Sequence, residues 1–130
     1  MKPFKLTAKY PTERQEQIGL MKWAKLRATT LPALSMLISI PNGGYALDPI
    51  SGAKLKAEGL AKGFPDLFLF YPRAPYCGLA IELKRRVGAS VRPEQAEWHE
   101  RLKSAGYAVV VAYGATEAIK AIEEYLLCKK

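Results

Sequence analysis

The fold of this chain is decided by Leu67-Phe-Leu-Phe-Tyr71 and Gly78-Leu-Ala-Ile-Glu-Leu83, two apolar segments of strand length. The turn between them contains Pro72-Arg-Ala-Pro75. Two such segments around a proline-containing turn predict an antiparallel β-hairpin. Because the hydrophobicity of both segments is nearly continuous, other elements are expected to cover both faces of the hairpin. The hairpin is therefore predicted to lie inside a sheet that is packed between helices.

The segments on either side of the hairpin supply the helices and the remaining strands. Apolar residues at helical spacing, N-terminal capping residues and glycines at the ends predict the helices. The expected helices cover 13–28, 51–61, 93–105 and 116–127, and the expected strands cover 36–40, 67–71, 78–83 and 107–112. The resulting order, α-β-α-β-β-α-β-α, predicts an α/β fold with a mixed β-sheet flanked by helices.

The composition is that of a basic globular chain. Its 130 residues include 20 Lys and Arg against 12 Asp and Glu, which gives a formal net charge of +8. That length predicts one domain over residues 1–130, and the charge favours a polyanionic partner. Two cysteines exclude a disulfide scaffold and suit a reducing compartment. Since no segment has the length of a membrane span or the pattern of a secretory signal, a cytoplasmic location is expected.

Three polar residues in and beside the predicted hairpin carry the chemical signal. Side chains alternate along a strand, so Glu82 and Lys84 are expected on one face. A hairpin centred on residue 74 pairs positions whose numbers sum to 148, which places Asp66 opposite Glu82. Directly opposed residues have Cβ atoms about 5 Å apart, where two carboxylates repel each other. A cation between Asp66 and Glu82 would remove that cost.

The ligand types indicate which cation fits. Oxygen ligands without histidine or cysteine suit Mg²⁺ or Mn²⁺ better than Zn²⁺. The only histidine, His99, is expected on the surface of its helix. Lys84 could orient an attacking water or stabilise negative charge, so the pattern predicts phosphodiester hydrolysis. The alternative is a turn residue, Asp66, beside an exposed ion pair of Glu82 and Lys84; the apolar context of Glu82 argues against it.

Several motifs resemble one family of nucleases. Phe64-Pro-Asp66 and Ile81-Glu-Leu-Lys84 resemble the PD-(D/E)XK nuclease signature, and specifically its VRR-NUC branch. The resemblance covers nearly the whole chain. It extends to Thr12-Glu-Arg-Gln-Glu-Gln-Ile-Gly, Ile40-Pro-Asn-Gly-Gly44, Gln95 before Trp98 and Ala105-Gly-Tyr107. It implies a restriction-endonuclease-like PD-(D/E)XK core, which agrees with the predicted order of elements.

The resemblance also implies roles for individual residues. Asp66 and Glu82 would bind the metal together with the carbonyl of Leu83, and Lys84 would be the catalytic lysine. Gln95 matches a glutamine that follows this strand in the family, and the resemblance places Gln95 and Glu13 among the catalytic residues. On the first helix both Glu13 and Glu16 lie near Gln17, and we favour Glu13 with Gln17. The residues expected to contact substrate are Gln17, Asn42, Gly43, Lys62, Arg85 and Arg86. An arginine is common after the Asn-Gly-Gly turn in the family, whereas Tyr45-Ala-Leu47 stands here.

The expected function is that of an endonuclease that depends on Mg²⁺ or Mn²⁺ and acts on DNA. Lysine and arginine side chains would hold the phosphate backbone. Similarity to stand-alone family members implies a homodimer that cuts branched DNA such as Holliday junctions, encoded by a bacterium or phage. Two alternatives remain: a nuclease that cuts any duplex or resembles a restriction enzyme, and a non-catalytic nucleic-acid-binding module. RNA as the substrate is also open.

Overall fold

A four-stranded mixed sheet forms the middle of the computed structural model, with the strands in the order β1-β2-β3-β4. The structure describes residues 10–41 and 48–127. In this part of the chain the strands are β1 (Leu37–Ser39), β2 (Leu67–Leu69), β3 (Leu79–Lys84) and β4 (Ala108–Tyr113). The helices are α1 (Glu13–Arg27), a 3₁₀ helix η1 (Pro32–Met36), α2 (Pro49–Ala57), α3 (Pro93–Ser104) and α4 (Ala115–Leu127).

The register of the central hairpin agrees with the sequence. β2 and β3 are antiparallel, and Leu67 pairs with Ile81, Phe68 with Ala80 and Leu69 with Leu79. Each pair of numbers sums to 148, as predicted. β1 is antiparallel to β2, whereas β4 is parallel to β3. The connection from β3 to β4 therefore crosses the sheet, and α3 forms that crossover.

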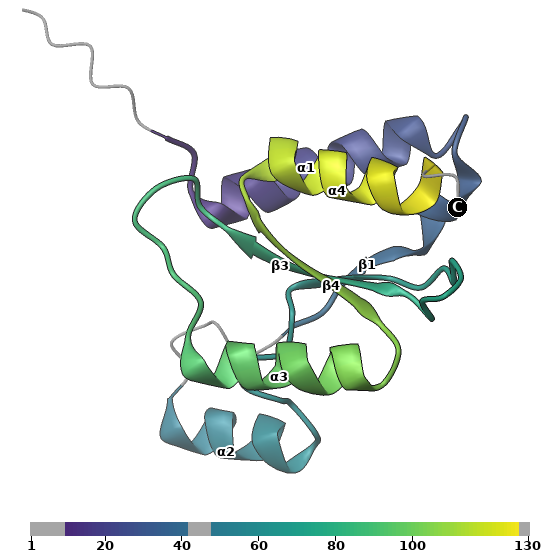
Figure 1. The fold of residues 1–130 in the computed structure, drawn as a ribbon. Helices are drawn as coiled ribbons and strands as arrows, with labels where there is room; N and C mark the ends of the chain where they lie inside the picture. The colour runs from purple at the N-terminus through teal and green to yellow at the C-terminus, as the bar shows by residue number, and fades with distance from the viewer. Residues whose placement is uncertain (1–9, 42–47, 128–130) are drawn as a thin grey trace, which may run out of the picture.

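Helices cover both faces of the sheet (Figure 1). α1 and α4 lie on one face, and α3 lies on the other. The main apolar core is on the side of α1 and α4, where β3 contributes Leu79, Ile81 and Leu83. A smaller apolar cluster under α3 contains Phe68, Ala80 and Leu102. The two faces of β3 thus take part in different packing, which leaves room for polar side chains beneath α3.

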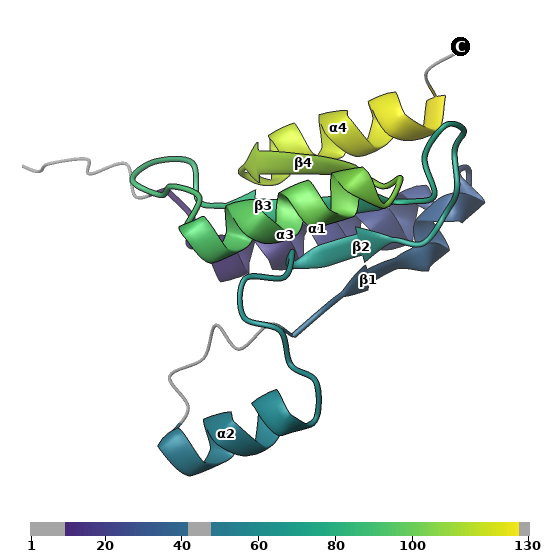
Figure 2. The same cartoon turned by 60° about the horizontal axis from the view of Figure 1, so that its bottom comes forward.

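α2 stands apart from this layered body. Figure 2 shows it beyond the sheet and its covering helices. None of its residues is buried. The sequence predicts a helix over 51–61, but α2 begins earlier because Asp48 caps it: the Asp48 side chain accepts the backbone N–H of Ser51. It also ends earlier, and the chain turns at Gly59, whose φ of +106° favours glycine.

The first two strands of the chain are shorter than the sequence predicts. The predicted strand over 36–40 is reduced to β1, because Pro32 starts a 3₁₀ helix that ends at Met36. The predicted strand over 67–71 ends at Leu69, which pairs with Leu37, the first residue of the antiparallel strand β1. Within the described residues no helix is both long and apolar enough to cross a membrane.

Candidate active site

The strand β3 brings two charged side chains to the α3 face of the sheet. Glu82 is fully buried, and Lys84 is 6% exposed. The alternate residues Ile81 and Leu83 belong to the main core on the opposite face. This is the alternation that the sequence predicts, and it allows one strand to hold a core and a polar site at once. The carbonyl of Lys84 accepts the backbone N–H of Gly114 at 2.8 Å, which fixes the end of the strand.

Asp66 lies beside the same end of β3. It immediately precedes β2, and its Oδ2 accepts the backbone N–H of Leu83 at 2.8 Å. In a strand the N–H and C=O of one residue point to the same side, so the Leu83 carbonyl also points toward Asp66. The structure therefore brings together the Asp66 carboxylate and the Leu83 carbonyl, two groups that the resemblance assigns to a metal.

The carboxyl group of Glu82 lies in an unusual electrostatic environment. Burial raises its pKa to about 9, and a hydrogen bond to the Asp66 side chain and the charge of Asp66 raise it further. Oε1 lies 3.3 Å from Nε2 of His99. Oε2 is buried and accepts no hydrogen bond from the described residues. A buried oxygen without a partner is costly unless a ligand takes that place.

A glutamine on α3 holds Lys84 in place. The Lys84 ammonium donates to Oε1 of Gln95 at 2.8 Å. The same oxygen accepts the backbone N–H of Arg92 at 2.9 Å, at the start of the helix. Two donors converge on one oxygen, so the orientation of Gln95 is determined by the helix end itself. Gln95 thus fixes the lysine side chain beside Glu82.

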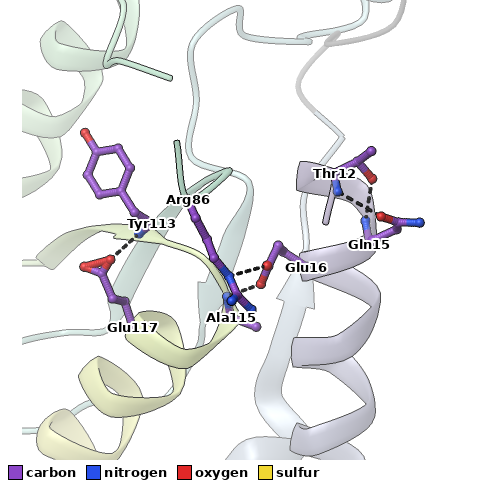
Figure 3. Close-up of polar contacts among 7 residues, drawn as sticks. All are labelled: Thr12, Gln15, Glu16, Arg86, Tyr113, Ala115 and Glu117. Atoms are coloured by element: carbon purple, nitrogen blue, oxygen red, sulfur yellow. Dashed lines mark hydrogen bonds and ion pairs between the residues drawn. The ribbon is translucent and has the colours of Figure 1, made fainter. Parts of the chain in front are cut away.

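Glu13 and Glu16 of α1 have different roles, and Figure 3 shows the contacts of Glu16. The Glu16 side chain is 2% exposed and accepts two hydrogen bonds, from Arg86 Nε at 2.8 Å and from the backbone N–H of Ala115 at 2.5 Å. These contacts tie α1 to the segment after β3 and to the start of α4. Much of the Glu13 side chain is accessible to solvent. The pKa of Glu13 is nevertheless raised, mainly by partial desolvation and then by the charge of Asp66. Glu13 rather than Glu16 is therefore the acid of α1 that faces the site.

A groove opens beside these residues at the end of β3. It has a volume of about 460 Å³. Its lining residues are Thr12, Glu13, Lys84, Arg85, Gly88, Ala89, Ser90 and Arg92. The lining carries three basic side chains and one acidic side chain, so it suits an anionic ligand. The segment after β3 and the start of α3 form much of its wall.

Of the other predicted contact residues, Arg85 lines this groove, whereas Gln17, Lys62 and Arg86 are not among its lining residues. The Gln17 side chain donates to Oγ of Ser39 at 3.0 Å, at the end of β1. Lys62 is exposed and lies 3.9 Å from Glu94 on the first turn of α3. Arg85 donates to the Gly88 carbonyl at 2.8 Å. Arg86 is bound to Glu16, which a sequence pattern gives no means of predicting. Asn42 and Gly43 lie outside the described residues.

The prediction that His99 is a surface residue is wrong. It is 6% exposed, and its ring contacts Glu82. Burial lowers its pKa, and the nearby Lys103 and Lys84 lower it further. His99 is four residues after Gln95, so both side chains lie on the helix face that points at β3. That spacing was the available signal, because a helix whose Gln95 reaches Lys84 turns His99 toward the same strand.

The donor set fits a hard divalent cation. No group of three or more His, Cys, Asp or Glu side chains is arranged to hold a metal within residues 10–41 and 48–127. Mg²⁺ does not need such a cage, since it is usually held by one or two carboxylates and keeps several waters. Asp66, the unpartnered oxygen of Glu82 and the carbonyl of Leu83 supply oxygen ligands of that kind.

Two acids, a lysine and a glutamine at one end of a mixed sheet are the arrangement expected of a nuclease-type α/β domain. The family model described as "VRR-NUC domain" matches residues 11–116. This chain therefore belongs to the VRR-NUC domain family. A solved structure titled "VRR_NUC domain protein" is similar at 32% sequence identity and a TM-score of 0.77, covering 90% of this chain and 89% of that one. A search of the curated proteins gives no match.

Proposed function

We propose that this protein is an endonuclease that hydrolyses phosphodiester bonds in DNA with the help of Mg²⁺ or Mn²⁺. One observation carries the proposal: a buried Glu82 oxygen that accepts no hydrogen bond lies beside Asp66, with Lys84 oriented on the same face by Gln95. A structural role would not require a polar group to be left unsatisfied in the interior.

Asp66, Glu82 and the carbonyl of Leu83 are the groups that would hold the cation. When bound there, a divalent cation would lower the pKa of a water and offset negative charge on the phosphodiester. The protein's own contribution is a set of oxygens that are fixed by the sheet. Asp66 is held by the Leu83 N–H, and Glu82 is held by its position within β3.

Lys84 is the group proposed to act on the reacting atoms. Its ammonium can donate a hydrogen bond to the attacking water or to a phosphate oxygen, where negative charge develops. Gln95 is a positioning residue, because it reaches Lys84 and not the groove. Glu13 and Gln17, from the first helix, are proposed to complete the polar wall of the site.

The DNA backbone is proposed to lie along the basic groove. Arg85 and Arg92 line it beside Lys84, and the chain carries a net charge of +8. Neutralising phosphates in this way gives affinity without sequence specificity. Further contacts are proposed from Asn42, Gly43, Lys62 and Arg86, the last of which already binds Glu16.

Branched DNA, such as a Holliday junction, is the proposed substrate, and a homodimer is the proposed active form. Cutting two strands requires two sites, and a two-fold dimer matches a symmetric junction. Sedimentation velocity of the full chain, alone and with a junction, should show two copies per junction; one copy per junction would overturn the dimer.

Cleavage of matched substrates tests the function. A four-way junction, a linear duplex, a single strand and an RNA duplex of related sequence are incubated with Mg²⁺, Mn²⁺ or EDTA. We expect metal-dependent cutting of the junction that is lost in Lys84→Ala and retained in Lys103→Ala. Lys103 is the matched control because it lies on α3 and pairs with Glu100 at the surface.

Each other outcome selects a different function. Equal cutting of the linear duplex would keep the nuclease and remove the preference for branched DNA. Faster cutting of RNA would replace the substrate. Binding without cutting under any metal would leave a non-catalytic nucleic-acid-binding module on this fold.

A further inference from the structure

Successive inward-facing residues of α3 contact successive residues on one face of β3. Lys84 contacts Gln95, and two residues back along the strand Glu82 contacts His99. One step further, Ala80 and Leu102 share an apolar cluster. Two residues of a strand span about 6.6 Å, and the helix steps of four and three residues span about 6 Å and about 4.5 Å. The helix therefore presents one side chain to each successive residue on this face of β3.

The middle step of this series treats the two oxygens of one carboxyl group differently. Oε1 of Glu82 lies 3.3 Å from Nε2 of His99, whereas Oε2 accepts no hydrogen bond in the described structure. Both side chains are nearly inaccessible, at 1% exposure for Glu82 and 8% for His99. A donor on one oxygen fixes the rotation of the carboxyl group and so determines where the other oxygen points.

We propose that His99 is a positioning residue that donates its Nε2–H to Oε1 of Glu82 and thereby directs Oε2 toward a divalent cation. The proposal rests on the proposed function, because it requires Asp66 and Glu82 to form a metal site. It adds a residue from α3 to a site otherwise built from the strands. His99 does not touch the metal or the substrate.

The chemistry of the position favours this role over simple packing. The next inward-facing residue of α3 is Leu102, and the neighbouring cluster is apolar, so an aliphatic residue would satisfy packing at position 99. Burying an imidazole there has a cost unless its polar atoms find partners. Groups that orient metal ligands in this way typically change metal affinity by 10- to 100-fold when they are removed.

Direct metal binding tests the proposal without relying on cleavage. The full chain is titrated with Mn²⁺ in a calorimeter, unaltered and as His99→Leu and His99→Gln. Leucine fills the space without a donor, and glutamine keeps an N–H donor. We expect His99→Leu to weaken Mn²⁺ binding by 10- to 100-fold and His99→Gln to recover part of that loss.

A second background separates orientation from packing. In Glu82→Gln the carboxylate is absent, so adding His99→Leu should cause no further loss of Mn²⁺ affinity. Thermal unfolding in EDTA supplies the structural readout, and we expect His99→Leu to unfold at the same temperature as the unaltered chain or higher. In cleavage assays the Mn²⁺ concentration for half-maximal rate should rise in His99→Leu, while kcat at saturating Mn²⁺ falls less.

The outcomes distinguish this proposal from the proposed function. If the unaltered chain binds no Mn²⁺, the metal site itself is overturned, and the role of His99 with it. If the unaltered chain binds Mn²⁺ and His99→Leu binds it equally well, only the role of His99 is overturned. Equal loss in His99→Leu and His99→Gln would show that the shape of the ring matters and the donor does not. If His99→Leu fails to fold, the Mn²⁺ affinity of His99→Gln is compared with that of the unaltered chain. A partial loss of affinity supports the role of His99, and a complete loss overturns it.

Discussion

The two faces of β3 differ in what they do with the same backbone. Toward α1 and α4 the strand presents Ile81 and Leu83, which are fully buried in a continuous apolar core. Toward α3 it presents Glu82 and Lys84, which are almost as buried but are held by polar partners. One face stabilises the sheet, and the rigidity it provides allows the other face to keep an unsatisfied carboxyl group in place. Burial alone therefore does not separate core residues from site residues, whereas the presence of polar partners does.

The largest effect on stability is expected from a substitution that leaves a cavity in the apolar core. Leu83→Ala removes a fully buried side chain from the core, so we expect it to lower the free energy of unfolding by about 2–5 kcal/mol. Lys84→Met, on the other face of the same strand, keeps the length of the side chain and should change that free energy by less than about 1 kcal/mol while cleavage is lost. Urea unfolding of both variants measures the contrast. Equal destabilisation by the two substitutions would remove the distinction between the faces.

A smaller loss is expected from the buried acid of α1. Both oxygens of Glu16 accept N–H groups, so in Glu16→Gln the amide nitrogen must face a donor. We expect a loss of about 1–3 kcal/mol in unfolding free energy. Glu13→Gln, one turn earlier and exposed, should leave stability unchanged and lower the cleavage rate. Thermal unfolding and cleavage of both variants check this pair, and the reverse pattern would exchange their roles.

The polar face should make stability depend on pH when metal is absent. Because the pKa of Glu82 is raised from 4.5 to about 9, the folded chain keeps a proton that the unfolded chain has lost. The resulting stabilisation is complete below about pH 4.5 and is lost as the pH rises through 9. Between pH 7 and 9, above the range in which His99 titrates, unfolding in EDTA should weaken by at most about 1.4 kcal/mol per pH unit. Glu82→Gln should remove this slope; an unchanged slope would assign it to another group.

The smallest effect concerns two neighbouring arginines just beyond β3. Arg85 lines the groove, so Arg85→Gln should weaken DNA binding and reduce the dependence of log affinity on log salt by about one unit. Arg86 binds Glu16, so Arg86→Gln should lower the free energy of unfolding. It should change the slope of log affinity against log salt less than Arg85→Gln does. Fluorescence anisotropy at several salt concentrations gives the slopes. A larger change of slope in Arg86→Gln than in Arg85→Gln would place the DNA on the other side of this segment.

The sequence predicted the parts that depend on local rules. The hairpin register followed from the position of its turn, and the shared face of Glu82 and Lys84 followed from strand alternation. These two rules were sufficient to place Asp66 beside the end of β3. The ends of α2 and the start of β1 were less predictable, because the cap at Asp48 and the 3₁₀ helix at Pro32 compete with simple periodicity.

The contacts that complete the site could not be predicted in this way. His99 reaches Glu82 only because α3 lies antiparallel along β3, which is a property of the tertiary fold. Arg86 was expected at the substrate, but Glu16 binds it across 70 residues of sequence. Pairings of this kind depend on how whole elements pack, and no local pattern of residues specifies them.

The ion pair of Glu16 and Arg86 has a consequence for when the site forms during synthesis. Glu16 also binds the backbone of Ala115, 99 residues further along the chain. Gly114 makes this approach possible, since a Cβ there would lie 2.9 Å from Cγ of Arg86. α1 can therefore take its final place only after α4 has begun to emerge. A nascent chain that has not yet exposed Ala115 holds Asp66, Glu82 and Lys84 but not the contact that fixes α1 beside them, so the site is assembled only after residues far beyond its own acids and lysine have been made.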